Sequence, residues 1–154
     1  MRPVQRALDP GLTAVAFRRS GQTWRRAGEF GIEVVNLQSV HGTHVFINLG
    51  LYINGLGNDV EPREERCHIR ARLERVVPNE YFESVRSIEP ESISADAVRA
   101  LLDHGIPWLA GLCTSAGLAA LLMSEQSKPI FIHRRVRSLH QMPPDKSLEP
   151  ARGG

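Results

Sequence analysis

The chain has 154 residues, a length that suits one domain with a hydrophobic core and is short for two. Its 19 basic and 17 acidic residues nearly cancel, and a net charge of +2 argues against a nucleic-acid binder that works by electrostatic attraction. Nearly all the basic residues are arginine, for which a GC-rich genome is the simplest explanation and anion recognition is the functional alternative. We expect one domain over residues 1–140 and a disordered tail over residues 141–154, which are rich in Pro and Gly.

The N-terminal half predicts one helix and then strands. Residues 3–12 favour a short helix, which the sequence Asp9-Pro10-Gly11 is expected to end or interrupt. Strands are expected at residues 23–26, 30–39, 44–53 and 67–74, separated by turns or polar connections. The third is the clearest, because aliphatic residues alternate along it at Val45, Ile47, Leu49, Leu51 and Ile53.

The C-terminal half predicts helices. Ser94 is expected to cap a helix that ends at Gly105, and Pro107 to open the next helix. Residues 77–90 and 126–139 are ambiguous between helical and other structure. Strands followed by helices indicate an α+β fold. We therefore predict an N-terminal helix, a four-stranded antiparallel meander, and C-terminal helices packed on the aliphatic face of the sheet.

One uncharged stretch, residues 106–123, approaches the length of a membrane span. It also contains Pro107 and two glycines, which favours one or two short buried helices over a span. The N-terminus lacks the apolar core of a secretory signal, and the two cysteines, Cys67 and Cys113, lack CxxC spacing. We expect a cytoplasmic protein with buried thiols and no membrane association, while a disulfide between the two cysteines stays open.

Several motifs are similar to those of a known family. They are Phe17, Arg18, Gly21, Trp24 and Arg26, then VVNLQ at 34–38, FINLG at 46–50, CHIR at 67–70 and HGIPWL at 104–109. Together they resemble an uncharacterised bacterial family, the domain of unknown function 4304, over most of the chain. The chain departs from the pattern at Ala16, where Gly is expected, and in its basic C-terminal end. The resemblance implies fold and compartment, and it carries over no catalytic residue because the family has no established activity.

Strand parity defines a candidate binding surface. If the aliphatic side chains of residues 45–53 face the helices, the alternate side chains face away, together with those of the neighbouring strands. This set combines amides, aromatics, a histidine and arginines: Asn36, Gln38, Phe46, Asn48, Tyr52, His68, Arg70 and Arg72. Arginine and amide groups together can hold an anion or a carboxylate. A solvated outer sheet face would contain the same residue types, so the pattern alone leaves both interpretations open.

Other chemistries find less support in the sequence. His41 and His44 lie near a turn, and the adjacent Cys67 and His68 would point to opposite faces of a strand, so no metal site is predicted. There is no GxSxG motif, and a core-facing Cys67 would be unreactive. The basic cluster at residues 133–137 lacks interleaved aromatics, which does not favour nucleic acid. No cofactor is expected.

Two functional hypotheses remain. The first is a non-catalytic interaction domain whose polar sheet face binds a protein partner or a small anionic ligand, for example an immunity-type or antitoxin-like partner of a toxin enzyme. The second is an enzyme for a small polar substrate, with His68 as acid–base and with Arg70 and Arg72 as anion binders. A pocket with a histidine–carboxylate contact would favour the enzyme.

Overall fold

The computed structural model describes residues 2–124 and 129–141, with side chains up to residue 139. The elements in chain order are α1 (Pro3–Ala14), β1 (Arg18–Ser20), β2 (Thr23–Ala27), β3 (Gly31–Val40), β4 (His44–Ile53), β5 (Ile69–Arg72), α2 (Asn79–Val85), α3 (Ala95–Ala100), α4 (Ile106–Leu112), α5 (Ser115–Met123), β6 (Phe131–Ile132) and α6 (Arg134–Gln141). The predicted tail, apart from Gln141 at the end of α6, lies outside the described residues.

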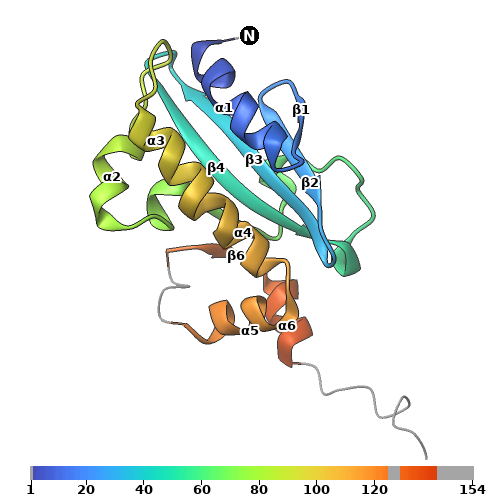
Figure 1. Ribbon diagram of the computed structural model, residues 1–154. Helices are drawn as coiled ribbons and strands as arrows, with labels where there is room; N and C mark the ends of the chain where they lie inside the picture. The colour runs from blue at the N-terminus through green and yellow to red at the C-terminus, as the bar shows by residue number, and fades with distance from the viewer. Residues whose placement is uncertain (1, 125–128, 142–154) are drawn as a thin grey trace, which may run out of the picture.

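The α+β prediction is confirmed, with an antiparallel meander in which each strand pairs with the next along the chain (Figure 1). Among the described residues the sheet has six strands, so the predicted number of four is wrong. The two additional strands are the edge strands β1 and β6, which are three and two residues long. Strands that short carry no readable alternation of apolar and polar residues.

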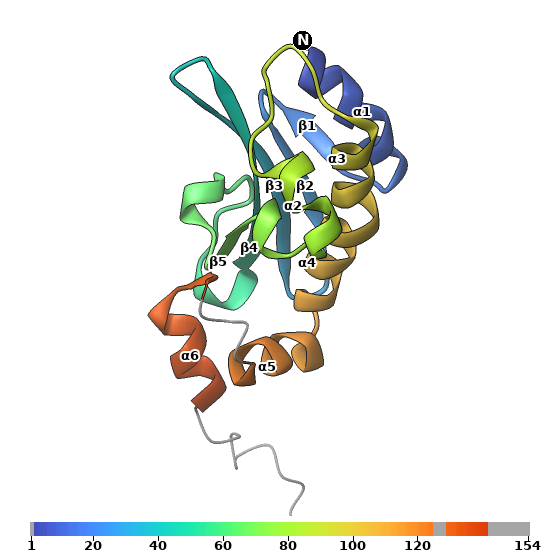
Figure 2. The same ribbon diagram turned by 90° about the vertical axis from the view of Figure 1, so that its left-hand side faces the viewer.

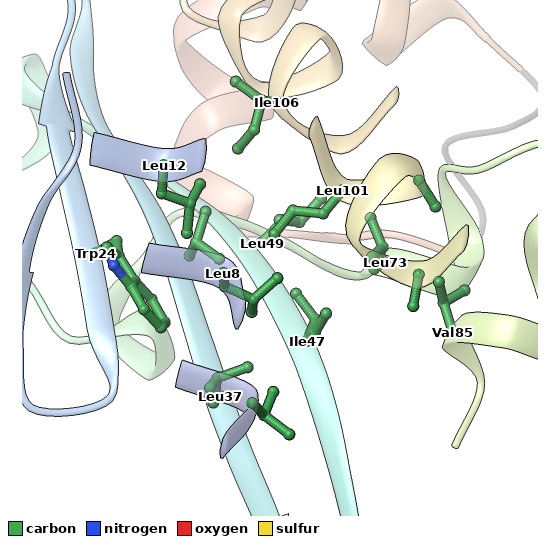
Figure 3. Packing of buried hydrophobic residues seen from close by; sticks show 14 of the residues in the cluster. Leu8, Leu12, Trp24, Leu37, Ile47, Leu49, Leu73, Val85, Leu101 and Ile106 are labelled. Atoms are coloured by element: carbon green, nitrogen blue, oxygen red, sulfur yellow. The ribbon is translucent and has the colours of Figure 1, made fainter. Parts of the chain in front are cut away.

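Helices cover one face of the sheet. Figure 2 shows α1, α3 and α4 on one side of the strands and the segment between β4 and β5 on the other. As predicted, Val45, Ile47 and Leu49 are buried, with exposed fractions of 4%, 1% and 0%. Figure 3 shows Ile47 and Leu49 of β4 among side chains from α1 and from the helices that follow the sheet. The alternate side chains of these strands therefore lie on the opposite face of the sheet.

Helix α1 continues through Pro10 to Ala14, so the prediction that residues 9–11 end or interrupt it is wrong. Proline removes one helical hydrogen bond and usually kinks or ends a helix. Here Leu8 and Leu12, on either side of Pro10, are 1% and 0% exposed, and this burial against the sheet outweighs the local preference.

Gly105 does not end a helix, which corrects a second prediction. The π-helical turn η4 (Leu101–Gly105) joins α3 directly to α4. The Ile106 backbone N–H bonds to the Leu101 carbonyl, and this wider turn accommodates Pro107 one residue later. A Cβ atom on Gly105 would lie 2.7 Å from Leu73 Cδ1, so the glycine permits close packing of the helix on the sheet side.

The ambiguous regions resolve into short elements. Residues 77–90 contain α2, and residues 129–141 contain both the β-prone strand β6 and the helix α6. Ser94 caps α3 as predicted, accepting a hydrogen bond from the Ala97 backbone N–H at 3.1 Å. Among the described residues, a single helix of sufficient length and apolarity to cross a membrane is not found; residues 95–112 and 115–123 meet those criteria only as a pair bent by 100°.

Candidate functional site

A row of polar side chains crosses the sheet on the face away from the helices. Thr23 of β2 lies opposite Asn36 of β3. Asn36 in turn lies opposite Asn48 of β4, and Asn48 lies opposite Arg72 of β5. Directly opposed residues in antiparallel strands hold their Cβ atoms about 5 Å apart, so neighbouring members of this row are within side-chain reach of one another.

The amides of this row are held by their neighbours. Asn36 Nδ2 donates to Thr23 Oγ1 at 3.0 Å, and Asn48 Nδ2 donates to Gln38 Oε1 at 3.0 Å. Gln38 Nε2 and Asn48 Oδ1 make no hydrogen bond with the part of the chain that the structure describes. A donor on the exposed Gln38 side chain therefore remains available on the strand surface, beside the largely buried amide of Asn48.

Arg72 contributes the charge of this surface. Its guanidinium Cζ lies 4.1 Å from the centroid of the Phe46 ring. Phe46 is two positions before Asn48 in β4 and so lies on the same face. Arg72 is exposed, and it forms no ion pair or hydrogen bond with any described residue. Stacking on an aromatic face restrains a guanidinium while leaving its N–H donors free to bind an anion.

These residues form the open patch, defined as Asn36, Gln38, Phe46, Asn48 and Arg72. All of them were predicted from strand parity. Thr23, which supports Asn36, was not predicted, although its position next to Trp24 in β2 places it on the face opposite to that buried ring. The parity of that strand was the signal that could have identified it.

The other three predicted residues, Tyr52, His68 and Arg70, form the covered patch. The segment 54–66, between β4 and β5, crosses this part of the face (Figure 2). Arg25 of β2 donates from Nε to the Pro62 carbonyl at 2.8 Å and so attaches the segment to the sheet. The same face of one sheet is therefore divided into a part where Gln38 and Arg72 are exposed and a part that other chain segments contact.

Arg70 is engaged in an ion pair. Its Nε and Nη2 donate to Glu64 Oε1 and Oε2 at 2.9 Å and 3.2 Å. The Glu64 side chain is 8% exposed and that of Arg70 is 34% exposed. The hydrogen bonds to Glu64 are the main cause that raises the pKa of Arg70. This guanidinium is therefore already satisfied by a carboxylate of the same chain.

His68 is held within the structure rather than presented on the surface. The Ile53 backbone N–H donates to His68 Nδ1 at 2.9 Å, which fixes the ring as the acceptor at that atom. The Tyr52 ring lies 4.6 Å away and the His133 ring 5.9 Å away, between centroids. Burial lowers the pKa of His68, and the nearby His133 and Arg135 lower it further. The neutral imidazole is therefore favoured.

Cys67 corrects one detail of the parity prediction. It was expected to face the helices with Ile69, but its side chain packs with Val34 and Tyr52 on the opposite face. Strand β5 begins at Ile69, so Cys67 precedes the regular alternation. It is a free, buried thiol, and burial raises its pKa to about 12. Cys113 is likewise free and buried.

Comparison with known proteins then identifies the family. The sequence model of the domain of unknown function (DUF4304) matches residues 8–111. The chain belongs to this family. The match covers β1 to β5 and all residues of both patches, and it ends before α5. No curated protein and no solved structure matches the chain.

The geometry of the DUF4304 domain restricts the chemistry of its sheet face. Within the described residues, no three or more His, Cys, Asp or Glu side chains are arranged to hold a metal ion. The open patch offers one cation, amide donors and acceptors, and an aromatic ring. Such a surface can recognise a carboxylate or another anion. That it binds one stays a prediction.

Proposed function

We propose that this DUF4304 domain is an interaction domain whose open patch binds an anionic group, most readily a carboxylate presented by a protein partner. Arg72 carries the proposal, because its guanidinium is exposed, is stacked on Phe46, and has no counter-charge among the described residues. An acidic side chain of a partner would supply that counter-charge in a planar, two-bond geometry.

The surroundings of Arg72 support recognition rather than plain solvation. Asn48, directly opposite Arg72, is only 6% exposed and is oriented by Gln38. A partner that covers the open patch would therefore meet amides that are already ordered, which reduces the entropy lost on binding. Phe46 adds aromatic surface, which is enriched at the centres of protein interfaces.

The geometry supports an enzyme less well. The acid–base candidate, His68, uses Nδ1 to accept a backbone hydrogen bond, and Arg70 is bound to Glu64. His68 and Arg72 are also four residues apart along the chain, about 13 Å in an extended strand. In one form of the binding proposal, this chain is an immunity- or antitoxin-like protein and its partner is a toxin enzyme.

The test compares matched variants in capture of partners from native cell extract. Arg72→Ala should lose at least about tenfold in recovery of a specific partner, since a charge-assisted contact is removed. Arg99→Ala is the control, because Arg99 is an exposed arginine of α3 on the helical side of the sheet. Equal recovery with wild type, Arg72→Ala and Arg99→Ala would overturn the proposal.

The captured partner also has to depend on its own acidic residues. Replacement of its surface carboxylates by amides should reproduce the loss of recovery seen with Arg72→Ala. The two changes combined should lower recovery little more than either change alone. A partner that turns out to be an enzyme inhibited by this chain would specify the antitoxin-like form.

A further inference from the structure

A second recognition site is suggested by a cavity on the helical side of the molecule, away from the open patch. The cavity has a volume of about 760 Å³ and lies among residues 75–78, helix α4, helix α5 and residues 129–130. Both helices contribute to its lining, and the helical course bends by 100° between residues 112 and 115. Volumes of this size accommodate small organic ligands.

Its walls are mainly apolar. Val76, Val77, Leu112, Leu121 and Ile130 contribute to the lining. Leu112, Leu121 and Ile130 are 4%, 8% and 8% exposed and belong to the second hydrophobic cluster, so this wall is part of the folded core. A ligand with a hydrocarbon or aromatic body would replace water against these side chains.

Four polar side chains also line the cavity: Arg75, His104, Trp108 and Ser124. Arg75 is exposed and makes no hydrogen bond or ion pair with the described residues. The ring nitrogens of His104 and the indole Nε1 of Trp108 likewise have no hydrogen-bond partner in the described part of the chain, although the His104 ring lies 5.2 Å from that of Tyr81. Arginine and tryptophan can only donate, so the complementary ligand must accept hydrogen bonds.

The π-helical turn contributes to this arrangement. His104 belongs to η4, and Trp108 follows four residues later in α4. The wider turn shifts the helical register before α4, and both residues line the same cavity. Turns of this kind are frequent at functional sites, and here Pro107 supplies the local reason for its presence.

We infer that this cavity binds a small aromatic or alicyclic carboxylate, with the carboxylate at Arg75 and the ring against Trp108 and the apolar wall. The guanidinium of Arg75, which has no counter-charge among the described residues, selects the anion, and the apolar walls select the ring. This inference does not depend on the proposed function of the open patch.

Benzoate is the probe, with benzyl alcohol as the neutral ring and acetate as the anion without a ring. The readout is the NMR resonance of the Trp108 indole Nε1–H. The other indole, that of Trp24, is fully buried and bonded to Asp9 at 2.9 Å, so it serves as an internal reference. Benzoate should shift the Trp108 resonance in a saturable manner and leave that of Trp24 in place, and both acetate and benzyl alcohol should bind at least about tenfold more weakly.

Two variants test the two halves of the inference. Arg75→Met should lower the affinity for benzoate by about tenfold or more without changing the affinity for benzyl alcohol. Arg99→Met, which lies outside the cavity, should change neither affinity. Gly111→Leu should weaken the binding of both ring-containing probes, because Gly111 lines the cavity and the new side chain would occupy it. A Cβ at this position has open space around it, so we expect the helix to tolerate the change.

The inference is overturned if the Trp108 indole resonance does not shift with benzoate, or if its shift does not saturate. It is also overturned if Arg75→Met binds benzoate as tightly as Arg99→Met does. Equal binding by Gly111→Leu and wild type would place the ligand elsewhere and would have the same consequence.

Discussion

The open patch and the covered patch occupy the same face of the same sheet, and they differ in what contacts them. Arg72 of the open patch stacks on Phe46 and has no counter-charge among the described residues. Arg70, two positions earlier in the same strand and on the same face, is bound by the carboxylate of Glu64. Side-chain direction is thus set by the strand, while availability is set by the segments that cross it.

The covered patch behaves as part of the core. Gly50 of β4 lies under Cys67, so that a Cβ atom at position 50 would be 2.7 Å from the Cys67 sulfur and 2.9 Å from its Cβ. Glu64 and His68 are each 7% exposed. If this comparison is right, changes in the covered patch should lower stability, whereas changes in the open patch should affect binding alone.

The largest loss of stability is expected from Gly50→Ala. The added methyl group has no room beneath Cys67, and overpacking of this kind should lower the free energy of unfolding by about 2 kcal/mol. Gly55→Ala is the matched control, because nothing lies within 4 Å of a Cβ at that position. Urea denaturation measures both. Equal stability of the two variants would show that the segment 54–67 does not pack on β4 as described.

Glu64→Gln should have the next largest effect. It removes the charge that pairs with Arg70 and should lower the free energy of unfolding by about 1–2 kcal/mol. The loss is smaller than for a fully buried ion pair because Arg70 is partly solvated. Glu65→Gln is the control, since Glu65 is 59% exposed and lies 3.9 Å from Arg63. If Glu64→Gln is as stable as Glu65→Gln in the same denaturation experiment, the ion pair with Glu64 does not stabilise the fold. Arg70 would then belong with the open patch.

A smaller effect is expected from pH. Burial lowers the pKa of His68 in the folded protein, while the unfolded chain titrates near the ordinary value of about 6.5. The unfolded state therefore binds the proton first as the pH falls. This contribution to stability is complete above about pH 6.5 and is lost as the pH falls from there through the folded pKa.

Denaturation at pH 7.5 and at pH 5 in wild type and His68→Gln measures that contribution. The difference between the two pH values should be smaller in His68→Gln, because the titrating group is absent. An unchanged difference would mean that another group causes the acid sensitivity.

The smallest effect on stability is expected from Arg72→Ala in the open patch. An exposed cation–π contact contributes about 0.5 kcal/mol, so the variant should remain folded with nearly unchanged unfolding free energy. A loss as large as that of Glu64→Gln would indicate that Arg72 is a structural residue, and partner capture with this variant would then have to be repeated with Arg72→Lys.

Strand alternation predicted much of this fold. The β4 pattern identified the buried face through Val45, Ile47 and Leu49, because a period of two is a local property of the chain. The open patch followed from the same parity. Pro10 and Gly105 were misread because local propensity ends helices at such residues, whereas packing of α1 and the wider turn η4 continue them.

Contacts between distant segments could not be predicted in this way. Cys67 was assigned to the wrong face because the start of β5 at Ile69 is decided by pairing with β4, not by the residues of β5 themselves. The cavity beside Trp108 depends on the angle between α4 and α5, for which the sequence has no local signal.

The α+β class, the family resemblance, the buried face of the sheet and the polar character of the other face could all be predicted from residue patterns along the chain. Which of those polar residues remain exposed depends on contacts between distant segments. Segment 54–66 supplies the carboxylate that neutralises Arg70 and no described residue supplies one to Arg72. Whether a charge is available to a partner is a property of its three-dimensional neighbours, and those come from elsewhere in the chain.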